Sequence, residues 1–105
     1  MRPTSINILG NTYSVTYVDN PAEVDWRKRE ALWGQIDYWT RGIRVYEKDR
    51  TSQDVLHTLI HEILHGIVSA LHIDDEKVDD ETTIDVLALA LADVLTRNGW
   101  LKEGE

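Results

Sequence analysis

The segment from Thr51 to Leu71 limits what this 105-residue chain can fold into more than any other segment. Two faces of the helix that it predicts are apolar, so we expect this helix to lie in the middle of the domain. Thr51, Ser52 or Asp54 can cap its first turn. The apolar residues that recur at helical spacing are Leu56, Leu59, Ile60, Ile63, Leu64, Ile67, Val68 and Leu71.

Two histidines and a glutamate interrupt this apolar pattern in the sequence LIHEILHGIV. On a helix, His61 and His65 lie about 40° apart in angle and roughly 6 Å apart along the axis, so their imidazoles can bind one metal ion. Glu62 is turned about 100° from His61, which keeps it off the metal but lets it hydrogen-bond a metal-bound water. This H-E-x-x-H pattern predicts a zinc ion on two histidines, with Glu62 as general base. The alternative is a pair of solvated or core histidines beside an incidental glutamate.

A third metal ligand has to come from outside the motif, because a catalytic zinc ion usually takes three protein ligands and keeps one position open. The chain has no cysteine, so the ligand set must consist of His, Asp or Glu. A second helix is expected to begin near Asp79 or Asp80, and antiparallel packing would return its first turn to the histidines. We predict Glu81 as the third ligand, with Asp80 and Asp85 as alternatives. Glu81 could instead complement the helix dipole, and Asp85 could orient a ligand histidine through its other ring nitrogen.

One zinc ion is the expected cofactor, and manganese and iron are the alternatives for such a ligand set. The remaining histidines are interpreted differently. His57, one turn before the motif, is expected to line the cleft, with a contact to substrate as the weaker alternative. His72 lies about 10 Å along the axis from His65 and is expected to be a cation at the helix C-terminus. Tyr38 and Tyr46 are expected in the core, although either hydroxyl could stabilise an oxyanion.

Two β-hairpins are predicted before residue 50. In Ser5–Val18, runs rich in β-branched and aromatic residues surround Gly10-Asn11. In Gly34–Lys48, Thr40-Arg41-Gly42 is expected to make the turn. The residues that give this second hairpin its β propensity are Ile36, Tyr38, Ile43 and Val45.

Between the hairpins, Asn20 can cap a short helix with Pro21 at its first position; an irregular excursion is the alternative. After the histidine helix, a second helix is expected to end at Asn98-Gly99. These elements predict one α+β domain over residues 1–105, in which a small antiparallel sheet packs on the central helix and on a C-terminal helix. The expected buried stripe of the second helix is Ile84, Leu87, Leu91, Val94 and Leu95.

A formal net charge of −8 disfavours nucleic acid and anionic lipid as partners, because both are polyanions. The acidic run IDDEKVDDE, Ile73–Glu81, is interpreted as a solvated loop. No apolar stretch reaches about 18 residues, so no membrane span is expected. The start MRPTSINILGN has no apolar run of the kind found in signal peptides, and we expect a cytoplasmic protein.

The sequence HEILHG, preceded by TSQDVLHTLI, resembles the small zincin-type metallopeptidases of phages and prophages, distant relatives of the ImmA/IrrE repressor-cleaving proteases and of the SprT-like group. GQIDYWTRGIRV resembles the strand-turn-strand before their active helix, and ETTIDVLALALADVLTRNGW resembles the segment after it. The resemblance covers residues 34–100 and implies a minimal zincin-like fold. It also implies zinc on His61 and His65, Glu62 as general base, and a gluzincin-type site that Glu81 completes. The interval before that glutamate is shorter than in the large gluzincins, and no second lobe closes the cleft.

These observations predict a zinc-dependent metallopeptidase that hydrolyses a protein or peptide substrate through a metal-activated water. The strand edge at Ile43–Glu47 is expected to hold an extended peptide by strand addition. The alternative is a non-catalytic, metal-stabilised binding module, since a small domain gains stability from a structural ion. Glu62 favours the enzyme, because a structural ion has no need of it.

Overall fold

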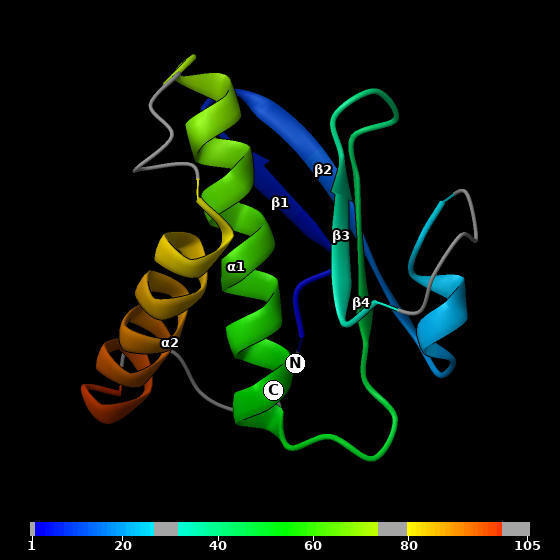
Figure 1. Cartoon of the computed structure of the whole chain (residues 1–105), viewed down its shortest axis with the longest axis vertical. Coiled ribbons are helices and arrows are strands. Elements are labelled where there is room, and N and C mark those ends of the chain that lie inside the picture. Colours follow the sequence, from blue (N-terminus) through cyan, green and yellow to red (C-terminus); the bar gives the residue numbers. More distant parts are fainter. Residues whose placement is uncertain (1, 27–31, 74–79, 100–105) are drawn as a thin grey trace.

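The domain consists of a four-stranded sheet and two helices arranged in layers (Figure 1). The computed structural model describes residues 2–26, 32–73 and 80–99. Helix α1 lies between the sheet and α2, as its two apolar faces predict, and the α+β class is confirmed. In chain order the elements are β1 (Ser5–Ile8), β2 (Asn11–Val18), the 3-10 helix η1 (Pro21–Glu23), β3 (Gly34–Asp37), β4 (Gly42–Tyr46), α1 (Ser52–Ala70) and α2 (Glu81–Arg97).

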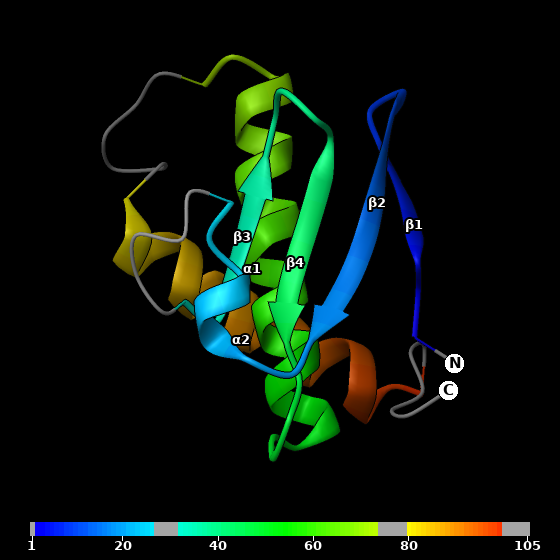
Figure 2. The same ribbon diagram turned by 90° about the vertical axis from the view of Figure 1, so that its right-hand side faces the viewer.

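The sheet is mixed, with the strand order β1-β2-β4-β3 (Figure 2). Both predicted hairpins are present as antiparallel pairs, but β2 and β4 pair in parallel, so the prediction of an antiparallel sheet is wrong. Val18, at the end of β2, pairs with Tyr46, and Gly34, at the start of β3, pairs with Val45. The end of β2 and the start of β3 therefore lie at the same end of the sheet, on either side of β4. The second hairpin therefore inserts its later strand beside β2.

This strand order also places a different strand at the free edge of the sheet from the one that the sequence predicts. The strand β4 is paired on both sides, so the expectation that Ile43–Glu47 offers an open edge is wrong. The edge strands of the sheet are β1 and β3, and β3 is the one that lies beside α1 near the H-E-x-x-H motif.

Local signals set the ends of the elements. The Thr51 hydroxyl accepts a hydrogen bond from the Asp54 N–H and caps α1. Asn20 caps η1 with Pro21 at its start, so the helical interpretation of this segment is confirmed. The first hairpin turns at Leu9-Gly10, one residue earlier than predicted, with φ angles of 48° and 91°. Gly99, with φ of 70°, follows the end of α2 as expected. The residues 74–79 of the acidic run lie outside the described residues.

The main core lies between the sheet and α1. Gly66 lets the helix approach the sheet closely, because a Cβ atom there would lie 2.8 Å from Cδ1 of Ile8 and 3.1 Å from Cδ1 of Ile36. The motif of the histidines is thereby held against the edge of the sheet. The buried residues of this core are Ile8, Tyr13, Val15, Ile43, Val45, Val55 and Leu59.

A second core joins α1 to α2. On α2 the buried positions are Ile84, Ala88 and Ala92, with Leu95 packed against them. The predicted stripe is therefore only partly correct, because three of its members are exposed. Alanines at the interface let the two helices approach closely, so the face with the small residues turns inward and the larger side chains flank it. The exposed members of the predicted stripe are Leu87, Leu91 and Val94, at 51%, 40% and 44% exposure. No helix in the described part of the chain has the length and apolar character needed to cross a membrane.

Gly34 is a second point of close approach, and it yields a stability prediction. A Cβ atom at Gly34 would lie 2.5 Å from Cγ2 of Thr58 and 3.2 Å from Oε2 of Glu62. We expect Gly34→Ala to lower the free energy of unfolding by about 1–3 kcal/mol, because it overpacks a buried contact. The measurement is urea denaturation of the purified protein.

The matched control is the double variant Gly34→Ala/Thr58→Ser, because serine lacks the methyl group that the new Cβ atom would meet. A double-mutant cycle should therefore show a favourable coupling of about 1 kcal/mol between the two substitutions. Additive effects of the two changes would contradict this packing argument.

Candidate metal centre

Two turns of α1 bring His61 and His65 together on one side of the helix. Their Nε2 atoms lie 3.2 Å apart, and the ring centroids are 4.9 Å apart in an edge-to-face arrangement. Both side chains are largely buried, with 13% and 14% exposure. The apolar residues between them pack on the sheet and on α2, so the backbone that carries the two imidazoles is anchored on both sides.

The first turn of α2 supplies the third side chain. Oε1 of Glu81 lies 2.6 Å from Nε2 of His65, and Oε2 of Glu81 lies 3.2 Å from Nε2 of His61. Asp80, one of the alternatives for this position, accepts hydrogen bonds from the N–H groups of Thr82 and Thr83. Asp80 therefore caps α2, and the carboxylate that reaches the Nε2 atoms of both His61 and His65 is that of Glu81.

These three side chains have the geometry of a metal-ligand set. Ligand atoms at about 2.0–2.1 Å from a tetrahedral zinc ion lie roughly 3.3 Å from one another. The two Nε2 atoms are 3.2 Å apart, as are Nε2 of His61 and Oε2 of Glu81, whereas Oε1 of Glu81 and Nε2 of His65 are at a hydrogen-bond distance of 2.6 Å. His61, His65 and Glu81 offer one ligand atom each, all within 4.8 Å of one another. Among the described residues, no other group of His, Asp or Glu side chains has this arrangement. The group could hold one metal ion.

Asp85 lies one helical turn after Glu81 and contacts two histidines of α1. Its Oδ1 lies 3.1 Å from Nδ1 of His61, so Nδ1 of His61 donates a hydrogen bond and Nε2 presents its lone pair to the metal site. His57 donates from Nε2 to the same carboxylate, at 3.1 Å, and to the Asp85 carbonyl, at 3.2 Å. Asp85 thus orients a ligand and attaches α2 to α1, while His57 stays outside the ligand set.

The last histidine is remote from the site. His72 is exposed and follows the end of α1 with φ of 53°, and its N–H donates to the Ser69 carbonyl. Of the two tyrosines considered for oxyanion stabilisation, Tyr38 lines the cleft beside His65. Tyr46 instead packs on Trp33.

Glu62 borders the metal ligands without joining them. Oε2 of Glu62 lies 3.9 Å from Nε2 of His61, and only 7% of the residue is exposed. Burial raises the pKa of the Glu62 carboxyl to about 8; the neighbouring charge of Glu81 adds to this rise, and the N–H of Ile36, which donates to the carboxylate, opposes it. A divalent cation next to this group would favour its ionised form.

The three candidate ligands border a cleft between β3 and the first turn of α2. Two cavities meet there, and both are lined by Leu32, Gly34, His61, Glu62 and Glu81. The first cavity, of about 790 Å³, extends toward the start of α1 and also includes Trp33, Arg50, Asp54 and His57. The second cavity, of about 460 Å³, extends toward the end of β3 and also includes Gln35, Ile36, Tyr38 and His65.

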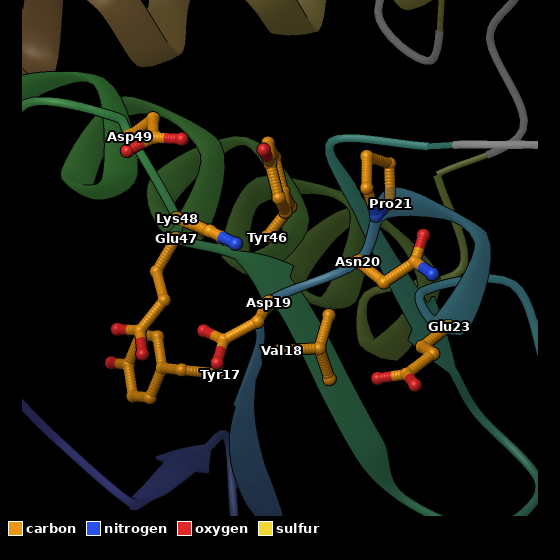
Figure 3. Close-up of a pocket in the computed structure, with 10 residues that line it drawn as sticks. All are labelled: Tyr17, Val18, Asp19, Asn20, Pro21, Glu23, Tyr46, Glu47, Lys48 and Asp49. Atoms are coloured by element: carbon orange, nitrogen blue, oxygen red, sulfur yellow. The ribbon is translucent and has the colours of Figure 1, made fainter.

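A third cavity, of about 740 Å³, lies at the ends of the parallel strands β2 and β4 (Figure 3). Carboxylates of Asp19, Glu23, Glu47 and Asp49 line it, together with Lys48. None of the three candidate metal ligands and no histidine borders this third cavity, so it is separate from the candidate metal site.

Sequence patterns did not indicate every residue of the site. In the sequence, Gly34 is only the start of a predicted hairpin. In the structure, its lack of a side chain leaves room for Glu62. The Ile36 N–H that holds Glu62 depends on where β3 lies, and no local pattern indicates it. The Arg50 guanidinium lies 4.4 Å from the centroid of the Trp33 ring, a contact that forms only after the sheet and α1 have packed.

Comparison with the models of known protein families, with curated proteins and with solved structures found no match to this chain.

Metal content provides the direct test of the site. We expect purified wild-type protein, dialysed against a zinc buffer, to retain one zinc ion per chain, and His61→Ala and Glu81→Ala to retain less than a tenth of it. Asp85→Asn should still bind zinc but about 10–100-fold more weakly, because Asp85 orients His61 and is not itself one of the three candidate ligands. Elemental analysis and competition with a zinc-binding dye measure these quantities.

Asp93→Asn is the matched control, because Asp93 is a carboxylate of the same helix whose partner is Arg97. Its zinc content should equal that of the wild type. Equal zinc content in Glu81→Ala and in the wild type would remove Glu81 from the ligand set.

Proposed function

We propose that this protein is a zinc-dependent metallopeptidase, a hydrolase that cleaves peptide bonds with Glu62 as general base. The observation that carries the proposal is the position of Glu62. Its carboxylate is buried 3.9 Å from a ligand nitrogen, outside the ligand set and held by the Ile36 N–H. An ion that served stability alone would need the three ligands and no such carboxylate.

Two imidazoles and one carboxylate are a donor set that suits zinc, and a zinc ion bound to three protein groups would keep one coordination position open. A zinc ion held there would supply an acidified water and an electrophile for the substrate carbonyl. Glu62 takes the proton of the attacking water as the bond to the carbonyl carbon forms, and then passes it to the leaving amine nitrogen. His61 keeps its lone pair directed at the site because Asp85 accepts the hydrogen bond from its other nitrogen.

The free edge of β3 is the place for an extended substrate. Because the Ile36 N–H is donated to Glu62, the edge of β3 that faces away from β4 borders the site. Residues of a strand alternate in the edge to which their peptide groups point, so Gly34 shares this edge with Ile36. A peptide that adds to β3 would pass directly over the metal ligands. The edge of β3 therefore replaces Ile43–Glu47 as the proposed place where an extended peptide pairs with the sheet.

The alternative function is a non-catalytic, metal-stabilised binding module built on the same three ligands. The buried carboxylate of Glu62 argues against it. Burial and the neighbouring charge of Glu81 disfavour the ionised form of Glu62 and cost stability, which a purely structural site has no reason to accept.

The variant Glu62→Gln separates the two functions. We expect it to retain the zinc content of the wild type and to lose hydrolysis by about 10²–10⁴-fold, because the amide cannot accept the proton of the attacking water. The measurement is the release of fragments from a peptide library, followed by mass spectrometry, with zinc content determined on the same samples.

Glu23→Gln is the control for this experiment, because Glu23 is an exposed carboxylate of η1 outside the cleft. It should cleave at the wild-type rate. Undiminished hydrolysis by Glu62→Gln would exclude Glu62 as the base, and zinc binding by a wild-type protein that cleaves no peptide would favour the binding module.

A further inference from the structure

The two cavities that meet at the metal ligands differ in chemistry. Beyond the shared residues, the first cavity is lined by the carboxylates of Asp49, Asp54 and Asp85 and by one guanidinium, that of Arg50. The second cavity adds no carboxylate to the shared ones, and the residues that line it alone are Gln35, Ile36, Tyr38 and His65. A substrate that crosses the candidate metal site would therefore meet additional carboxylates on one side, and an aliphatic and an aromatic side chain without additional carboxylates on the other.

Arg50 offers little to an anion in the first cavity, because three of its five N–H donors already bond to the protein. The guanidinium donates to the Tyr46 carbonyl at 2.7 Å, to the Asp54 carbonyl at 3.0 Å and to the Thr58 hydroxyl at 2.7 Å. Its face lies over the Trp33 ring. Arg50 thus forms part of the wall, and three carboxylates against one guanidinium leave the cavity with an excess of negative charge.

The carboxylates of this cavity are not equivalent. Asp85 accepts hydrogen bonds from His57 and His61, and Asp54 lies close enough to Arg50 to influence its pKa. Asp49 has no hydrogen bond or ion pair of its side chain within the described residues, and it is exposed. Asp49 and Asp54 are therefore the groups that remain to receive a cation from a substrate.

The direction of β3 orients a substrate across the cleft. Trp33, just before β3, lines only the first cavity, and Tyr38, just after β3, lines only the second. The strand therefore runs from the first cavity to the second. Antiparallel pairing is the more stable arrangement for an added strand. A peptide that pairs in this way runs in the opposite sense, so its N-terminal part lies at the second cavity and its C-terminal part at the first.

We infer that the substrate is a polypeptide with an apolar residue before the scissile bond and a lysine or arginine after it. This inference rests on the proposed function. The aliphatic stem of the basic side chain packs on the exposed Trp33 ring, and its charged end reaches Asp49 and Asp54. The apolar residue packs against Ile36 and Tyr38, which line only the second cavity.

The test uses zinc-loaded protein and three matched peptides that keep one apolar residue before the bond and place Lys, Leu or Glu after it. We expect kcat/KM for the Lys peptide to exceed that for the Glu peptide by at least tenfold, with the Leu peptide between them. A fourth peptide, with Lys before the bond and the apolar residue after it, should be cleaved more slowly than the first. Mass spectrometry of the products identifies the bond that is cut.

Charge substitution links any preference to this cavity. The double variant Asp49→Asn/Asp54→Asn should reduce the ratio of kcat/KM between the Lys and Glu peptides at least threefold, because exposed ion pairs are individually weak. Asp54→Lys should reduce it further. Asp93→Asn, which removes a carboxylate of α2 outside the cleft, should leave the ratio and the activity unchanged.

The outcomes separate the inference from the function on which it rests. Metal-dependent hydrolysis that is lost in Glu62→Gln but shows no preference for Lys over Glu would overturn the substrate inference and leave the peptidase standing. A preference for Lys before the bond would overturn the assigned direction. A ratio unchanged in the double variant would remove Asp49 and Asp54 as its source. Cleavage of none of the four peptides, nor of the library used for Glu62→Gln, would overturn both proposals.

Discussion

The contact between the first turn of α2 and the histidine face of α1 is the interaction on which the site depends. The two histidines come from one helix and are positioned by helical geometry alone. The third side chain, Glu81, contacts His65 from a position 16 residues later in the chain. Two features hold that segment in place. Ala88 and Ala92 pack on Ile60 along the interface of the helices, and Asp85 accepts hydrogen bonds from α1 next to the ligands.

A second constraint comes from the sheet side of α1. The helix is pressed against β1 and β3 because Gly66 offers no side chain to the isoleucines that face it. Gly34 allows a similar close approach of β3 to α1, and it leaves room for the Glu62 carboxylate, because a Cβ atom at Gly34 would lie 3.2 Å from Oε2 of Glu62. The group proposed as general base is thus nearly enclosed, next to another carboxylate, and held by a backbone N–H. The raised pKa of Glu62 means that its ionised form lowers the stability of the fold, as is common at sites where function and stability compete.

The sheet shows how far local patterns reach. Each hairpin is indicated by residues close in sequence, since β-branched runs and turn residues specify strands and their immediate return. Which strand of the second hairpin lies beside β2 depends on contacts between segments distant in sequence, and no local signal indicates it. That choice makes β3 rather than β4 a free edge of the sheet, next to the candidate metal site. The helix α2 gives a similar lesson. Both the leucines and the alanines of α2 recur at helical spacing. Close packing against α1 favours the smaller alanines at the interface, so Leu87 is exposed.

By itself, the sequence determined the elements with strong periodicity and the side chains whose relation is fixed within one helix. A separation of four residues on a helix brings His61 and His65 together in any fold, and a glutamate directly after the first histidine borders the same face. The sequence also identified Glu81 as a candidate third ligand, because Glu81 lies in the first turn of the next helix, which antiparallel packing returns to the histidines. Only the tertiary structure decided that Asp80 is used as a cap, that Asp85 orients His61, and that the Ile36 N–H holds Glu62. The physical reason is that these contacts join segments distant in sequence, and their distances are set by how the two cores pack.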